Sequence, residues 1–434
     1  MASSSYGWSS MDKKMKKALN SDTSIDSITD DNLSMIFSNL DHFGLARSIC
    51  VNKSWRDCIH ESTILQKKYE KQKMDYPDLF NATASPRPAT LKNLLNDFAM
   101  QQHKMSFLNN ESVDLEVHSQ GGEQCRMKMG RILTGVGVKV LRIWSLEKYE
   151  HPEEYYVPDK LTLDDIDFDQ DKVVGLLGSH IGIWRRSGKR ITKFPSTYDT
   201  STFGVCMRFI DQEAVVGCCD GATCVYDMDK EKCSSIISMH DGSVTCLALT
   251  DNRLIFSASS LGSIKLASLS YGEIVSSFET TRLTGVTTLC NKPFSSLLFV
   301  GTNSGCMYCW DLRGMKLLWN EQVSPNKIFS VQHMQSDKSS VVVGGSDGVL
   351  RIVNQDTGEV VSSYVIGDDP IEDELTGYSI IGRGKGRMIP IDENNLDYIP
   401  RTHTPPITSL VVGMQKVITT HKDKAMRVWK FSSM

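Results

Sequence analysis

The 434-residue sequence lacks long apolar runs, and its positive and negative charges nearly cancel. No stretch approaches the roughly 18 consecutive apolar residues that indicate a membrane span, so we expect no membrane partner. Residues 1–24 also lack the apolar segment of a secretory signal. The 48 Lys and Arg residues against 52 Asp and Glu residues give a net charge of −4. This balance argues against nucleic acid as a partner, because proteins that bind it usually carry a basic excess.

Cysteine is scarce as well, with 12 residues in the whole chain. We interpret these residues as reduced, mostly buried thiols and expect an intracellular protein, in the nucleus, the cytoplasm or both. The pair Cys306 and Cys309 has half of the spacing of a zinc ribbon, and no second pair completes it. We therefore predict no metal site and no cofactor.

The sequence contains none of the common catalytic motifs, neither HExxH, nor GxSxG, nor HxE with paired cysteines. The ten histidines are scattered, and a structural hydrogen bond to a nearby Ser or Thr explains His240 better than a catalytic role. Five aspartates cluster without the Gly and distal Glu of a calcium loop, and we interpret them as a solvated strand edge: Asp164, Asp165, Asp167, Asp169 and Asp171. The chain is predicted not to be an enzyme.

The first 110 residues have helical rather than strand periodicity. Residues 1–24 are rich in Ser and Lys, and we expect a disordered, solvated tail; its run Lys13–Lys17 could alternatively act as a nuclear address. Residues 25–70 read as a small helical module, because Leu33, Ile36, Phe37 and Leu40 share one helical face. Such a module buries little surface alone, so a partner is expected to cover one face. Residues 71–111 are predicted to be a helical linker.

From residue 112 onward short strands recur with a period near 40 residues. Eight windows of eleven residues read as strand, tight turn and strand, and their last residues lie 38 to 43 positions apart: Trp144, Trp184, Tyr226, Ala267, Trp310, Val353, Ile391 and Trp429. Five glycines share one turn position at which a positive φ is expected: Gly221, Gly262, Gly305, Gly348 and Gly386. With a further strand on each side of the window, this repeat predicts a β-propeller of four-stranded blades over residues 112–434.

The ends of the repeat region predict how the ring closes. Only five residues follow Trp429, so the last blade lacks an outer strand, and residues 113–118 form a strand without a repeat of their own. We expect 113–118 to cross back and complete that blade. We favour eight blades. A seven-bladed ring with residues 368–405 as an insertion is the alternative, because 368–375 are too acidic for a buried strand.

The windows resemble the WD repeat, with Trp310-Asp311 as the dipeptide and Tyr226-Asp227 as a near variant. Residues 28–60 resemble the F-box, with a Leu/Ile helix over 31–40 followed by Val51 and Trp55-Arg56, although Ile28-Thr29 stands where that family has Leu-Pro. The order of module, linker and propeller resembles the F-box/WD-repeat family, the substrate receptors of SCF-type ubiquitin ligases.

This resemblance implies that the module docks a Skp-type adaptor, and through it a cullin, while the propeller holds an unknown protein substrate. The candidate adaptor contacts are Ile28, Leu33, Ile36, Phe37, Leu40, Leu45, Val51 and Trp55. Receptors that read phosphorylated targets place arginines around the turns between second and third strands, yet only one such turn position here is basic. The candidate substrate contacts are Leu177, Arg383, Lys385 and Lys422, with residues 382–387 interpreted as a charged turn.

Two other functions remain open from the sequence. The chain could be a propeller scaffold of a different assembly, with 25–70 as a helical cap. The basic runs Lys13–Lys17 and Arg383–Arg387 also prompt a nucleic-acid-associated propeller, which the overall charge disfavours.

Overall fold

The computed structural model describes residues 30–75 and 112–431, with gaps in both ranges, the longest at residues 390–403. The chain divides into two compact units, Met1–Gln101 and Gln102–Met434, which are described separately. The predicted tail, Ile28 and most of the predicted linker lie outside the described residues. Among the described helices, none combines the length and the apolar character that crossing a membrane requires.

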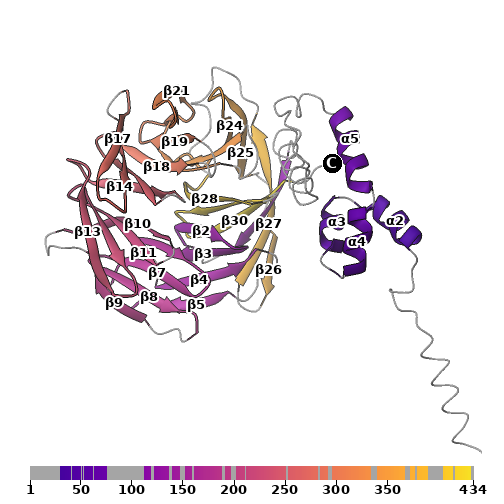
Figure 1. Ribbon diagram of the computed structural model, residues 1–434, viewed down its shortest axis with the longest axis horizontal. Coiled ribbons are helices and arrows are strands. Elements are labelled where there is room, and N and C mark those ends of the chain that lie inside the picture. Colours follow the sequence, from indigo (N-terminus) through magenta and orange to yellow (C-terminus); the bar gives the residue numbers. More distant parts are fainter. Residues whose placement is uncertain are drawn as a thin grey trace, which may run out of the picture. The chain divides into compact units, whose positions relative to one another are not determined.

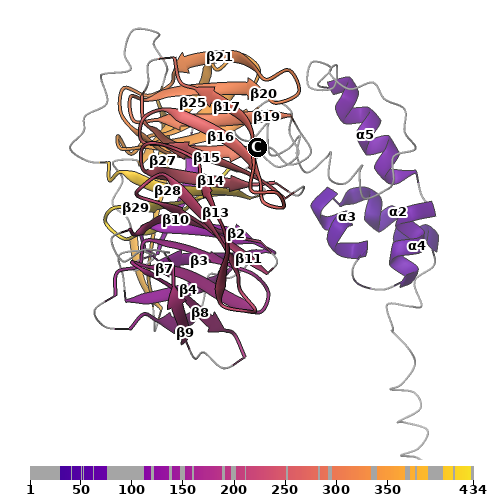
Figure 2. The same ribbon diagram turned by 60° about the vertical axis from the view of Figure 1, so that its left-hand side comes forward.

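The first unit contains short helices, as the apolar periodicity predicts. They are α2 (Asp30–Asn39), α3 (His42–Ile49), α4 (Lys53–Glu61) and α5 (Ile64–Asp75), and α2, α3 and α4 gather into one group (Figure 2). Most of the residues at helical spacing point inward, and the core consists of Leu33, Phe37, Leu45, Ile59, Ile64 and Leu65. The rings of Phe37 and Trp55 meet edge to face with their centroids 5.3 Å apart. α5 includes residues 71–75, the start of the predicted linker.

The second unit is a ring of four-stranded blades, numbered here in chain order (Figure 1). Blade 1 consists of β2 (Gln124–Lys128), β3 (Arg131–Gly135), β4 (Val140–Ser145) and β5 (Glu153–Tyr156). Blade 2 consists of β6 (Asp165–Phe168), β7 (Lys172–Leu177), β8 (His180–Arg185) and β9 (Ile191–Pro195). Blade 3 consists of β10 (Gly204–Ile210), β11 (Glu213–Cys218), β12 (Ala222–Asp227) and β13 (Lys232–Ser238).

The ring continues with three more blades of the same order. Blade 4 consists of β14 (Val244–Leu249), β15 (Leu254–Ser259), β16 (Ser263–Ser268) and β17 (Ile274–Glu279). Blade 5 consists of β18 (Val286–Asn291), β19 (Leu297–Thr302), β20 (Cys306–Asp311) and β21 (Lys316–Gln322). Blade 6 consists of β22 (Ile328–His333), β23 (Ser340–Gly345), β24 (Leu350–Asn354) and β25 (Val360–Ile366). In every blade the first strand is the inner one and packs beside the inner strands of its neighbours.

Blade 7 joins the two ends of the propeller sequence. Its first three strands are β28 (Ile407–Gly413), β29 (Lys416–His421) and β30 (Met426–Lys430), and its outer strand is β1 (Ser112–His118). β1 pairs antiparallel with β30, so that Leu115 lies opposite Trp429. The Lys430 ammonium also forms an ion pair with Glu116 of β1. The first strand of the propeller thus covers the edge that blade 7 would otherwise expose.

The propeller prediction is confirmed, but the favoured number of eight blades was wrong. The described strands form seven blades, and the inner strands of blades 6 and 7, β22 and β28, are direct neighbours. The described part of the seventh sequence window, residues 381–389, does not form a hairpin: it lies in one long strand, β27 (Ser379–Ile389). β27 runs between β25 and β1 and joins the sheets of blades 6 and 7, and β26 (Glu372–Thr376) pairs with it alone. Residues 368–405 are therefore an insertion in a seven-bladed ring.

Glycine explains why β27 cannot be the middle strand of an eighth blade. A middle strand needs apolar side chains to fill the wedge against the next blade, whereas β27 alternates Gly with Arg and Lys. Gly386 lies tight against β1 and β30, and a Cβ there would come within 2.7 Å of Val113 and 2.8 Å of Trp429. Gly221, at a true turn, has φ +89°, and Gly262, Gly305 and Gly348 also have positive φ, but Gly386 does not.

Three buried histidines of the propeller must stay neutral. Burial lowers the pKa of His118 and of His240 to about 4 and that of His421 to about 3. His240 contacts the hydroxyl groups of Ser257, at 2.7 Å, and Ser263, so the predicted structural hydrogen bond is confirmed. Because the Pro405 carbonyl can only accept, His421 donates from Nδ1 and accepts the Thr419 hydroxyl proton at Nε2.

We expect the propeller to lose stability on mild acidification. Between pH 6.5 and about 4 the unfolded chain binds more protons at these histidines than the folded chain, so lowering the pH favours unfolding. Each histidine costs about 2 kcal/mol at pH 5. Urea unfolding at a series of pH values between 7.5 and 5 measures how steeply the free energy of unfolding changes with pH. His240→Gln is expected to flatten this dependence by about a third, and a stability that does not change over this range would contradict the burial of the three rings as neutral groups.

Candidate adaptor surface and central channel

The helical unit exposes large apolar side chains beside its closed core. Met35 and Ile36 on α2 are 67% and 48% exposed, and Val51, just after α3, is 59% exposed. α2 ends close to Met35, whose carbonyl accepts hydrogen bonds from the side chains of Ser38 and Asn39. Apolar groups held on short, capped helices are suited to contact a partner protein.

The structure divides the predicted adaptor contacts into two groups. Leu33, Phe37 and Leu45 are buried in the core, where they support the helices and have no surface to offer. Leu40 and Trp55 are partly buried against the same core. Ile36 and Val51 are the exposed members. That these residues dock an adaptor stays a prediction.

The structure does not bring the predicted substrate contacts together. Leu177 is fully buried in the core between blades 1 and 2, so its assignment as a substrate contact was wrong. Lys422 is exposed in the turn between β29 and β30. Arg383 and Lys385 are exposed, but they lie along β27, so the interpretation of residues 382–387 as a turn was also wrong.

Two aspartates that the sequence placed at a solvated edge are buried in the middle of the ring. Asp165 and Asp167 lie on β6, the inner strand of blade 2. Asp165 pairs with Arg126 at 2.7 Å and with Arg208 at 3.2 Å, and Asp167 pairs with Lys128 at 2.6 Å. The three cations lie on β2 and β10, the inner strands on either side of β6. The interpretation as a solvated strand edge was wrong for this pair, because neighbouring blades supply the countercharges.

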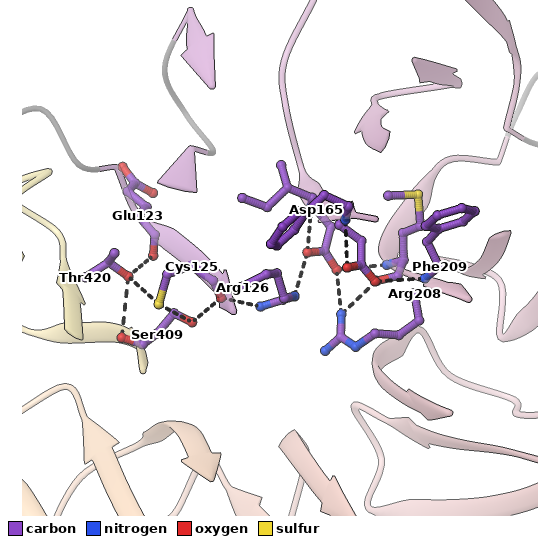
Figure 3. Close-up of polar contacts among 12 residues, drawn as sticks. Glu123, Cys125, Arg126, Asp165, Arg208, Phe209, Ser409 and Thr420 are labelled. Atoms are coloured by element: carbon purple, nitrogen blue, oxygen red, sulfur yellow. Dashed lines mark hydrogen bonds and ion pairs between the residues drawn. The ribbon is translucent and has the colours of Figure 1, made fainter. Parts of the chain in front are cut away.

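Asp165 holds two guanidinium groups at fixed positions in the middle of the ring. Arg126 and Arg208 approach its carboxylate from different sides (Figure 3). The carboxylate also accepts the backbone N–H groups of Ile166 and Met207, both at 2.8 Å. Burial disfavours the charged form of Arg208, but the charges of Asp165 and Asp167, with smaller contributions from neighbouring groups, together outweigh it and raise the pKa of the guanidinium. All four bonds stabilise the ionised carboxylate, so the group is fully satisfied despite its burial.

The aspartates also join blade 2 to blade 3, because Asp165 and Asp167 accept the N–H groups of Met207 and Phe209 on β10. At some other blade junctions a threonine performs this task. Thr245, for example, donates to the Val286 carbonyl of the next inner strand at 2.6 Å. The carboxylates therefore replace a neutral connection with one that also positions charge.

A cavity of about 370 Å³ lies at the carboxyl-terminal ends of the inner strands. Lys128, Asp167 and Arg208 form its polar side, and Leu249, Leu289 and Val412 are among the apolar residues that line it. The sequence analysis sought substrate contacts at the turns between second and third strands. Because each second strand runs antiparallel to the first, these turns lie beside the starts of the inner strands, at the opposite end of the blades from the cavity. The cavity is therefore a site that the sequence reasoning missed.

A sequence signal for this cluster did exist. Arg126, Asp165 and Arg208 follow one another at intervals of 39 and 43 residues, about one repeat each. Charges of alternating sign at equivalent positions of successive inner strands predict ion pairs across blade junctions, since inner strands are neighbours.

Comparison with known proteins identifies the two units. Residues 25–67 match the family model of the F-box domain, and a propeller follows, so the chain is an F-box protein with a propeller. It is 40% identical over 461 residues to an F-box/WD-40 repeat-containing protein of Arabidopsis thaliana, and the match covers 100% of both chains. The chain belongs to the F-box/WD-40 repeat family.

A solved structure supports the fold alone. The crystal structure of the computationally designed Ika8 protein superposes with a TM-score of 0.52 at 18% sequence identity. The match covers 72% of this chain and 97% of the designed one.

Proposed function

We propose that the chain is the substrate-recognition subunit of an SCF-type ubiquitin ligase. F-box domains generally bind Skp-type adaptors, and the match over residues 25–67 includes the exposed Met35, Ile36 and Val51. The observation that carries the proposal is this set of exposed apolar side chains beside a core that is already closed. Large apolar side chains that stay exposed beside a closed core are available to contact a partner protein.

In this role the chain does no chemistry of its own. Its helical unit binds the adaptor, and through it a cullin, while the propeller holds the protein to be ubiquitinated. Holding the target in the complex raises the effective concentration of its lysines near the ubiquitin-carrying enzyme. We place this function in the nucleus, the cytoplasm or both.

Affinity capture of the full chain, with and without proteasome inhibition, tests this function. We expect a Skp-type adaptor and a cullin under both conditions, and ubiquitin-modified partners that accumulate only under inhibition. A partner set that contains neither adaptor nor cullin, and that inhibition does not change, would instead indicate a propeller scaffold with residues 25–70 as a cap.

A further inference from the structure

The cavity at the inner-strand ends presents positive charge to whatever enters it. In each ion pair the cation is the exposed partner: the side chains of Arg126, Lys128 and Arg208 are 20%, 37% and 26% exposed, against 4% and 2% for Asp165 and Asp167. Three cations against two buried carboxylates leave one net positive charge. An incoming group therefore meets ammonium and guanidinium donors, and a single carboxylate matches the charge that remains.

The rest of the lining is apolar or amide-bearing. Leu249 and Val412 come from the inner strands of blades 4 and 7, which border the cation-bearing blades 3 and 1, and Leu289 comes from blade 5. Asn291 and Gln332, from blades 5 and 6, add side-chain amides that are partly exposed. Amide side chains both donate and accept hydrogen bonds, as a peptide backbone requires.

We propose that this cavity binds a peptide segment in which an Asp or Glu is flanked by aliphatic residues. The carboxylate lies against Lys128 and Arg208, the aliphatic side chains lie against Leu249 and Val412, and Gln332 bonds to the backbone. This inference rests on the proposed function, because it assigns the segment to the protein that the receptor captures. It places recognition at the carboxyl-terminal ends of the inner strands and uses carboxylate rather than phosphate chemistry.

A displayed peptide library tests the proposal. Peptides with eight randomised positions are selected on the purified full chain, on Arg208→Gln, and on Lys193→Gln, which removes an exposed cation from the outer strand β9. We expect the wild type and Lys193→Gln to enrich Asp or Glu next to Leu, Ile or Val. Enrichment on Arg208→Gln should be at least fivefold weaker, the effect of losing about 1 kcal/mol of charge-assisted bonding.

Three outcomes would overturn the proposal: no enrichment on the wild type, enrichment of basic peptides, or equal enrichment on Arg208→Gln. Thermal unfolding checks that the variant folds, and Lys128→Gln, at the more exposed cation, replaces it if it does not. Adaptor binding is measured on the same proteins. Because Arg208 lies outside the helical unit, loss of peptide selection with adaptor binding retained separates this proposal from the proposed function.

Discussion

Replacement of Ile36 and Val51 together by aspartate is expected to weaken binding of a Skp-type adaptor at least 100-fold. Both side chains are exposed in the free helical unit, so the substitutions leave its core intact. Burial of one aliphatic side chain in an interface contributes about 1.5–3 kcal/mol, and an unpaired carboxylate adds a desolvation penalty. Titration calorimetry of the full-length variant with the purified adaptor measures the loss.

A matched control separates this effect from added negative charge. Asn32→Asp plus Ser54→Asp places two carboxylates at exposed positions in the first turns of α2 and α4, where the helix dipole favours them. This variant should bind the adaptor within about threefold of the wild type. Equal binding by the Ile36 and Val51 variant would show that the adaptor docks elsewhere on the chain.

The second large effect concerns closure of the ring. Leu115→Asp is expected to lower the free energy of unfolding of the propeller by about 4 kcal/mol or more, because it buries an unpaired carboxylate opposite Trp429. Trp429 is itself fully buried, and its indole N–H donates to Thr419 at 2.8 Å. The new carboxylate therefore disrupts the packing around Trp429 in the interior of blade 7. Urea unfolding followed by tryptophan fluorescence measures the change.

The neighbouring position on the same strand supplies the control. Asp114 is exposed, and Asp114→Asn should change stability by less than about 0.5 kcal/mol. If Leu115→Asp is as stable as Asp114→Asn, then β1 does not hold blade 7 together.

The repeat in the sequence predicts the propeller but miscounts its blades. The period near 40 residues reports hairpins of apolar strands, and the first six windows, up to the one that ends at Val353, show that pattern. The window ending at Ile391 has the spacing without the apolar side chains, and it forms β27 instead. Spacing alone cannot separate a blade from an inserted strand. The acidic residues 368–375, which have no place on an inner strand, carried the information that the count required.

The helical face was predictable, but its division into core and surface was not. Leu33, Ile36 and Phe37 fit the same periodicity, yet only Ile36 is exposed, because the packing of α4 against α2 decides which side is covered. Similarly, the acidic run gave no sign by itself that Asp165 and Asp167 would be buried. Their countercharges are about one repeat away in each direction, and a local view of the sequence cannot see them.

Size-exclusion chromatography of the purified full chain with a Skp-type adaptor and a cullin tests most directly whether the chain is a ligase receptor. The F-box match and the exposed Ile36 and Val51 predict a single complex that contains all three proteins. The Ile36 and Val51 aspartate variant should elute apart from the other two. If the wild-type chain elutes alone, at protein concentrations well above the dissociation constant expected of a stable complex, this result would contradict the assignment of this protein as the receptor subunit of such a ligase.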